Sequence, residues 1–194
     1  MSKKPFAPPV TISRPDFLRG GNDAWFRETI YSLSEAVNSL GVCRVAFGRH
    51  LGLSPSQFVV LMGVAQLQEY DGVTIRLLAE HISMATTHTT TEVGRLVRRK
   101  LLIKKPSPVD GRSVLVSLSL AGEEAVLRIA PVLRRINDLL FQKISPKELD
   151  VVRRFCTTLS RNAQYALVEL EDEVLQAVTS AEAGKKRRHP SPAM

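Results

Sequence analysis

The side chains best suited to binding another molecule lie between residues 86 and 98, where small polar residues are followed by arginines. Val93, Leu96 and Val97 recur at helical spacing, so this segment is predicted to be a helix with one buried side. Its other side carries Thr87, His88, Thr91 and Arg95, with Thr90 at the margin. Short polar side chains can reach base edges, and arginine can bind guanine or phosphate. This side is therefore predicted to lie in a groove of DNA, with Ser83 capping the helix.

More cations follow this helix. They are Arg98, Arg99, Lys104 and Lys105, and they are predicted to hold phosphates. The alternative is that they form a solvated basic face. Farther on, Arg112 is predicted to enter or flank the minor groove, with Asp110 placed to orient it through a charge-assisted hydrogen bond.

The elements that must position these side chains can also be read from spacing. Apolar residues from Thr74 to Ile82 have helical periodicity, which predicts a helix just before the polar one. After it, the turn-rich segment 106–111 separates Leu102–Lys105 from an alternating run, Ser113–Leu118, as expected for a hairpin. Two successive helices followed by a basic hairpin constitute a winged helix-turn-helix. The fold class is therefore predicted to be mainly α with a small β-wing.

Four short motifs in this region resemble the MarR family of bacterial transcription regulators. They are Leu77-Leu78-Ala79-Glu80, Gly94-Arg95-Leu96-Val97-Arg98-Arg99, Asp110-Gly111-Arg112, and Val116-Ser117-Leu118-Ser119-Leu120-Ala121-Gly122. Helical order extends the likeness over roughly Asn22 to Glu173. The chain departs from the family at Lys100, where a glycine usually ends the recognition helix. The residue at which this helix ends is therefore not predicted. The resemblance implies a DNA-binding protein whose dimer is built from its terminal helices.

Long amphipathic helices are predicted on both sides of the winged unit. Apolar residues recur at intervals of three and four over residues 22–50 and again over residues 120–178. Capping-box patterns with a following proline begin helices at Ser54 and at Ser145, and Pro131 should bend the helix in which it lies. The terminal helices are interpreted as dimerisation helices; burial within one chain is the alternative.

The predicted organisation has three parts. Residues 1–21 form a flexible N-terminal arm, residues 22–178 form the regulator domain with its DNA-binding unit at about 54–119, and residues 179–194 form a basic disordered tail.

A small-molecule site is suggested by Arg44, which lies within the apolar stripe of the first long helix. A cation on an apolar face needs an anion or access to water, so an internal salt bridge or a solvent-reaching side chain is one explanation. The other is a counter-ion for a carboxylate ligand. In the family, small effectors bind between the first, second and fifth helices. By helix order, the residues that could line such a pocket are Arg44, Phe47, Phe58 and Met62.

Composition narrows the class of partner. The net charge is +8, and residues 74–112 hold eight lysines or arginines against three acidic residues, an excess of five positive charges in the proposed reading unit. The four histidines lack metal-ligand spacing, and no nucleophile elbow, P-loop or dinucleotide fingerprint is present, so no enzyme, metal or cofactor is expected. Without a signal peptide or a run of 18 apolar residues, the protein is expected to be cytoplasmic.

These observations predict a homodimeric, sequence-specific transcriptional regulator, a repressor released from a palindromic operator by a small anionic aromatic ligand such as a phenolic carboxylate. Two alternatives remain open. One is an oxidant-sensing regulator that acts through Cys43, beside Arg44. The other is a nonspecific architectural DNA-binding protein.

Overall fold

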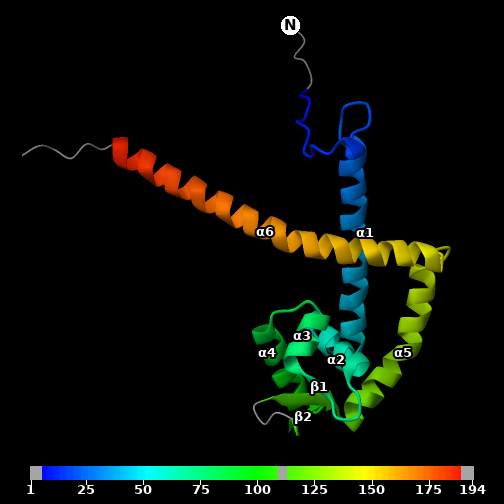
Figure 1. Ribbon diagram of the computed structural model, residues 1–194. Helices are drawn as coiled ribbons and strands as arrows, with labels where there is room; N and C mark the ends of the chain where they lie inside the picture. The colour runs from blue at the N-terminus through cyan, green and yellow to red at the C-terminus, as the bar shows by residue number, and fades with distance from the viewer. Residues whose placement is uncertain (1–5, 109–112, 189–194) are drawn as a thin grey trace, which may run out of the picture. The chain divides into compact units, whose positions relative to one another are not determined.

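The computed structural model describes residues 6–108 and 113–188, with side chains described as far as residue 174. Its elements (Figure 1) are η1 (Pro15–Phe17), α1 (Ala24–His50), α2 (Pro55–Leu67), β1 (Val73–Thr74), α3 (Ile75–His81), α4 (Thr86–Arg98), β2 (Leu102–Pro106), β3 (Val114–Leu118), α5 (Leu120–Leu140) and α6 (Pro146–Arg188). The chain forms two compact units that divide between Asn137 and Asp138. The predicted class, mainly helical with a small β-wing, is confirmed.

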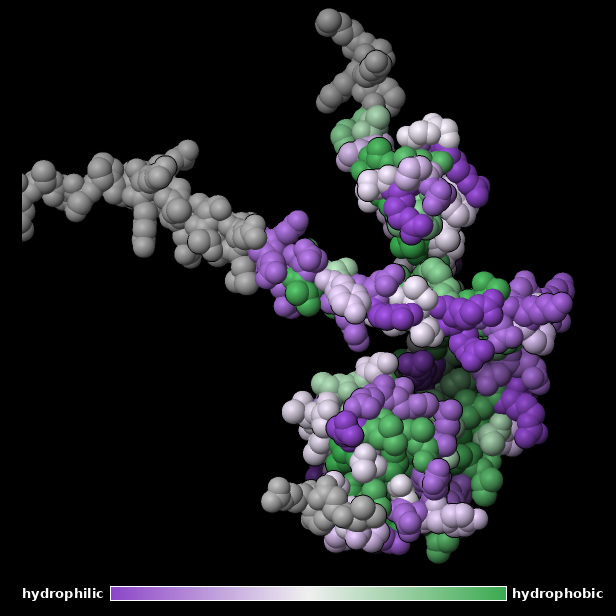
Figure 2. Space-filling view, viewed as in Figure 1, coloured by the Kyte–Doolittle hydropathy of each residue, from purple (hydrophilic) through white to green (hydrophobic). Residues whose placement is uncertain are grey.

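Both long terminal helices keep apolar side chains in solvent. On α1, Ile30, Val37 and Leu40 are exposed, and on α6 the same is true of Leu149 and Val152 among others. Figure 2 shows apolar residues interspersed among hydrophilic ones on the visible surface of these helices. None of the helices among the described residues is both long enough and apolar enough to cross a membrane.

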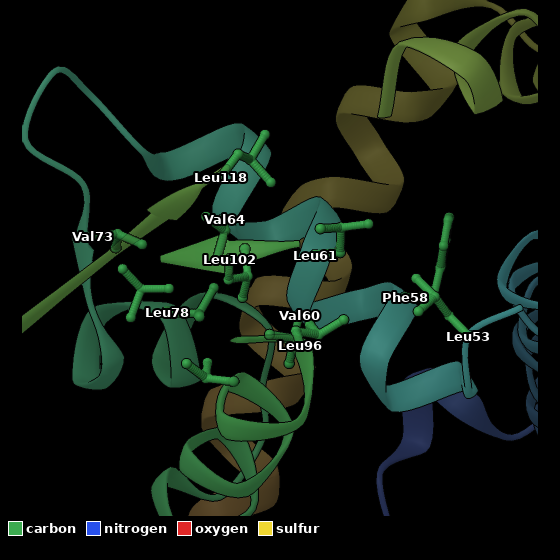
Figure 3. Packing of buried hydrophobic residues seen from close by; sticks show 12 residues of the cluster. Leu53, Phe58, Val60, Leu61, Val64, Val73, Leu78, Leu96, Leu102 and Leu118 are labelled. Carbon is green, nitrogen blue, oxygen red and sulfur yellow. The ribbon is translucent and has the colours of Figure 1, made fainter. Parts of the chain in front are cut away.

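The winged unit, in contrast, has a closed core built around α2. Four completely buried residues belong to one hydrophobic cluster: Leu61 on α2, Leu78 on α3, Leu96 on α4 and Val116 on β3. Figure 3 shows the three leucines among the side chains of this cluster. The sheet order is β1-β3-β2, with β2 and β3 antiparallel and Leu102 opposite Leu118. The hairpin prediction is therefore confirmed, whereas the two-residue strand β1 was not predicted.

Helix starts follow local sequence signals. The Ser54 Oγ accepts from the Gln57 N–H at 3.2 Å, and the Gln57 Oε1 accepts from the Ser54 N–H at 3.2 Å, which is the capping box that the sequence predicts. At the start of α6, the Ser145 N–H donates to the Glu148 carboxylate at 2.7 Å. The Ser145 hydroxyl donates to the same carboxylate at 2.6 Å, and these two hydrogen bonds lower the pKa of Glu148.

The N-terminal segment is attached to the first turn of α1, although the sequence predicted a flexible arm. The Asp23 carboxylate accepts from the Thr11 N–H at 2.7 Å and from the Thr11 hydroxyl at 2.6 Å. Asp23 also pairs with Arg27. The Arg19 guanidinium lies 3.9 Å from the centre of the Trp25 ring, a cation–π contact. These contacts give the segment a specific docking site, which the prediction lacked.

The C-terminal end of the chain also differs from its prediction. Helix α6 continues to Arg188, so residues 179–188 are helical where a disordered tail was expected. Alanine, glutamate, lysine and arginine are strong helix formers, and the single Gly184 costs only about 1 kcal/mol relative to alanine. Extending an existing helix also avoids the cost of nucleating a new one. Residues 189–194 lie outside the described part of the chain.

Candidate nucleic-acid interface and ligand pocket

Helix α4 has a buried side and a polar exposed side, as its spacing predicts. Its buried residues are Thr89, Glu92, Val93 and Leu96. The exposed residues include every position predicted to face DNA: Thr87, His88, Thr90, Thr91, Arg95, Arg98 and the C-cap Arg99. The buried side packs against the core of the winged unit, and the exposed side is left available for a large ligand.

Two of the exposed hydroxyls are partly committed to the helix. The Thr90 hydroxyl donates to the Thr86 carbonyl at 2.8 Å, and the Thr91 hydroxyl donates to the Thr87 carbonyl at 3.0 Å. A hydroxyl that donates its proton in this way still has lone pairs that can accept. Thr90 and Thr91 are therefore placed to accept from donors such as the amino groups of cytosine or adenine.

Ser83 does not cap α4, and this prediction was wrong. Helix α4 begins at Thr86 with Ala85 at the N-cap position and no side-chain cap. Ser83 lies after the end of α3 with a left-handed φ of 52°. Its N–H donates to the Glu80 carbonyl at 3.3 Å, and the Met84 N–H donates to the Ala79 carbonyl at 3.0 Å. This pair of bonds is a Schellman motif, so Ser83 terminates α3 instead of starting α4.

The open question at Lys100 has the same kind of answer. Lys100 has a left-handed φ of 60°. Its N–H donates to the Val97 carbonyl at 2.9 Å, and the Leu101 N–H donates to the Leu96 carbonyl at 3.0 Å, a second Schellman motif. The helix therefore ends where a glycine would end it, although a lysine occupies the position. Lysine pays a steric cost in this conformation that glycine does not.

The cations beyond α4 do not form one uniform group. The Arg99 guanidinium donates to the Gly52 carbonyl at 2.6 Å and thus links the end of α4 to the turn after α1. Lys104 and Lys105 are both exposed. However, they are paired with Val116 and Leu115 respectively, and successive residues of a strand point to opposite faces of the sheet. The two lysines consequently cannot lie on one face of the wing.

The hairpin loop is described only at its base. The Ser107 N–H donates to the Ser113 carbonyl at 2.9 Å and closes the hairpin. Asp110 and Arg112, predicted to contact DNA, lie outside the described residues. Their contribution to the interface stays a prediction.

Glu92 was missed by the sequence reasoning. It is 2 % exposed, and its Oε1 lies 2.6 Å from Nη1 of Arg95 and 3.4 Å from Nε2 of His88. The other oxygen, Oε2, is buried and has no hydrogen-bond partner among the described residues. A buried acceptor left without a partner costs about 1–3 kcal/mol. The spacing of His88, Glu92 and Arg95, four and three residues apart on a helix, is the signal that could have revealed this cluster.

A hollow of about 430 Å³ lies between α1, α2 and the turn after α3. Among the residues that line it are Arg44, Phe58, Met62, Gln66, His81 and Ser83. A second hollow of about 690 Å³ shares Arg44, Ile82 and Ser83 with the first. Arg44 is exposed and makes no ion pair or hydrogen bond within the described residues, so the internal salt bridge that was one explanation for it is not seen there. His81 does have a partner, since its Nε2 lies 3.2 Å from Oε1 of Gln66.

Three of the four residues predicted for a ligand site thus border one hollow, and Phe47 does not. Its ring instead packs against the Phe58 ring, with 6.0 Å between centroids. The hollow also differs from the predicted location, because none of its lining residues comes from α5. Phe47 can support the position of Phe58, but it does not border the hollow.

Comparisons with known proteins agree with this architecture. Residues 51–113 match the model of the MarR family. A probable transcriptional regulator from Pseudomonas aeruginosa is 29% identical, with 66% of this chain and 94% of that chain covered and a TM-score of 0.51. BpsR of Bordetella bronchiseptica, whose DNA binding is regulated by 6-hydroxynicotinic acid, is 23% identical, with 69% and 98% covered and a TM-score of 0.53.

A third solved structure is the M. tuberculosis transcriptional regulator MosR in complex with DNA, 22% identical, with 71% of this chain and 96% of that chain covered and a TM-score of 0.55. Among curated proteins, none matches the chain. Residues 51–113 therefore resemble the MarR family, and the fold around them is shared with solved transcriptional regulators.

Proposed function

We propose that this chain is a MarR-family regulator, a homodimeric, sequence-specific repressor that leaves a palindromic operator when a small anionic aromatic ligand binds. The observation that carries the proposal is the exposed side of α4, where Thr87, His88, Thr91 and Arg95 lie away from the residues that the helix buries in the core of the winged unit. Helix-turn-helix proteins place a polar helix face of this kind in the major groove, where it contacts base edges. The complex of MosR with DNA supports the same use of the shared fold.

The dimer is supported by the apolar side chains that α1 and α6 leave in solvent. Along α6, Leu149, Val152 and Leu159 recur at intervals of three and seven and are each roughly half exposed. Near-heptad spacing of this kind is typical of helices that pack against other helices. A two-fold dimer would place two α4 helices on half-sites about 34–36 Å apart, which predicts an approximately palindromic operator.

Ligand control is supported by the position of the hollow. Arg44 provides a cation that has no partner among the described residues, and the Phe58 ring provides an aromatic surface nearby. Ile82 and Ser83, which also line the hollow, belong to the turn that leads into α4. A ligand there can release DNA only to the extent that it binds the DNA-incompetent conformation more tightly. An aromatic carboxylate fits this lining, and BpsR, which shares the fold, responds to a hydroxylated aromatic acid.

The test is binding of the purified protein to DNA upstream of its own gene, at physiological salt and with excess unrelated DNA as competitor. A panel of aromatic acids is then titrated into the complex. Retained binding that one acid releases is the expected result. Binding that the competitor erases, on this and on other candidate operators, contradicts the sequence-specific proposal and supports the architectural alternative.

The Arg44→Met variant tests the ligand site. It should lose most of the response to the acid, because Arg44 lines the hollow. Its DNA affinity should stay nearly unchanged, because Arg44 belongs to α1 and not to the DNA-reading helix α4. Arg49→Met, on the same helix but outside both hollows, is the matched control. An unchanged response in Arg44→Met would exclude Arg44 as the anion-binding residue. A different result would favour the oxidant-sensing alternative over ligand control. In that case peroxide releases the DNA, none of the acids does, and Cys43→Ser removes the effect of peroxide.

A further inference from the structure

The Glu92 cluster lies inside the proposed reading helix but is not explained by DNA binding alone. The Glu92 side chain is 3 % exposed, whereas the Arg95 and His88 side chains are each 51 % exposed. One carboxylate oxygen contacts both of them, and the other is buried with no partner among the described residues. A buried anion thus lies directly beneath two half-exposed residues of the polar side of α4.

This arrangement does not hold the fold together. Both partners of Glu92 belong to α4 itself, so the carboxylate ties α4 to no other element within the described residues. Removing a carboxylate from water is unfavourable unless its oxygens are well paired, and here one oxygen is not. An apolar residue of similar size would suit the buried position better. The effect of Glu92 must therefore be sought in the two side chains that it orients.

The geometry points to Glu92 as a positioning residue that sets the base specificity of α4. The salt bridge uses Nη1 of Arg95 and restricts the rotamer of a long, flexible side chain. Arginine has five N–H donors, so enough remain for the paired contacts to O6 and N7 of guanine. The same contact fixes the imidazole of His88, one helical turn away. This inference rests on the proposed function, since it requires that α4 reads DNA.

The negative charge of Glu92 has a second consequence. It neutralises Arg95, which lowers the attraction of this part of α4 for phosphates of any sequence. An oriented but neutralised arginine favours base contacts over backbone contacts. Glu92 should therefore raise the ratio of specific to nonspecific affinity without raising nonspecific affinity. Within each half-site, the base pair read by Arg95 should be a G·C pair.

The test compares the intact protein with its Glu92→Gln variant, which keeps the shape of the side chain and removes its charge. Affinities for the operator and for unrelated DNA are measured at several salt concentrations, together with a profile of base preference at each operator position. The specific-to-nonspecific ratio should fall about 10-fold or more, as expected when one good bidentate base contact loses its orientation. The loss should fall on the same base pair at which Arg95→Gln loses discrimination. Nonspecific binding should stay equal or strengthen, with a steeper salt dependence.

Glu80→Gln is the matched control, because Glu80 forms an exposed i,i+4 pair with Arg76 on the neighbouring helix α3. It should leave the ratio unchanged. If Glu92→Gln does not fold, Glu92→Met serves in its place, since it fills the buried volume with an apolar side chain. An unchanged ratio, or an equal loss of specific and nonspecific binding, would overturn the inference. If the intact protein itself shows no sequence preference, the proposed function fails and this inference fails with it.

Discussion

In the winged unit, Leu61, Leu78 and Leu96 have no solvent-exposed surface at all, whereas Val152 and Leu159 on α6 are 50 % and 44 % exposed. Side chains of the same kind are thus used in two ways within one chain. The winged unit buries its apolar residues among α2, α3, α4 and the sheet, and so completes its own core. The terminal helices α1 and α6 present theirs to whatever can cover them.

The difference indicates which part of the protein would depend on a partner in the proposed dimer. Stability that comes from a closed core is a property of one chain and does not change with concentration. Stability that comes from covering an exposed face depends on the concentration of the partner. The comparison therefore predicts two classes of variant, one that affects assembly and one that affects the folding of a single chain.

The largest effect is expected from charges on the apolar side of α6. Val152→Asp combined with Leu159→Asp should prevent dimer formation, because each buried carboxylate would lose its hydration. A monomer contacts one half-site only, so operator affinity should fall about 100-fold or more through the loss of bivalent binding. Sedimentation velocity and operator titration measure the two effects.

Thr158→Asp is the control for this variant, since Thr158 is exposed on α6 but lies off the apolar side. It should leave both the dimer and the operator affinity intact. A double variant that still sediments as a dimer would contradict the interface proposed for α6. The winged unit should keep its own fold in either variant.

The next largest effect should come from the closed core. Leu96→Ala removes a completely buried side chain, and its free energy of unfolding should fall by about 3 kcal/mol, as is typical of cavity-forming substitutions. Chemical denaturation at two protein concentrations measures this loss. The decrease should be similar at both concentrations; a decrease that grows on dilution would mean that the core of the winged unit also depends on the partner chain.

Features that are local in sequence were predicted well. The Ser54–Gln57 capping box, the alternation of β3 and the exposed polar side of α4 all depend on residues within a few positions of one another. Their physical causes, namely hydrogen bonding within one turn and the periodicity of helix and strand, act over that same distance.

The error at Ser83 arose because this residue lies between two elements. Ser83 follows α3 and precedes α4, and its side chain is compatible with either an N-cap or a loop. Whether Ser83 is an N-cap or a loop residue depends on the separation of the two helices, and tertiary packing sets that separation. Glu92 was missed because its charge suggested an exposed position, although its spacing to His88 and Arg95 made a buried ion pair possible. The strand β1 has only two residues and is defined by its pairing with β3, not by a pattern of its own.

A smaller effect, of opposite sign, is expected at Lys100. Lys100→Gly should raise the free energy of unfolding by up to about 1 kcal/mol, because glycine accommodates the left-handed φ of 60° without a steric cost. The greater freedom of glycine in the unfolded chain offsets part of this gain. Denaturant titration of the two proteins measures the difference. Arg98→Gly, two residues earlier in ordinary helical conformation, should instead destabilise, and a loss of stability in both variants would contradict the Schellman assignment.

The smallest expected effect lies at the start of α1, where one terminal helix has a contact that it completes within its own chain. The hydroxyl and N–H of Thr11 hold the pKa of Asp23 below its ordinary value. A carboxyl whose pKa is lowered on folding stabilises the folded form above its unfolded pKa, near 3.8, and loses that contribution as the pH falls through the folded pKa. The N-terminal segment should therefore stay docked at pH 7 and detach in the acidic range below about pH 4. Trp25, the single tryptophan, contacts Arg19 of this segment, so its fluorescence should change over that range.

Asp23→Asn should show the detached spectrum already at pH 7, whereas Asp16→Asn, which alters only an exposed pair with Arg14, should behave like the original protein. A pH response that survives in Asp23→Asn would mean that another group controls the docking of the N-terminal segment. The start of α1 would then not be an exception to the contrast between the closed core of the winged unit and the exposed terminal helices.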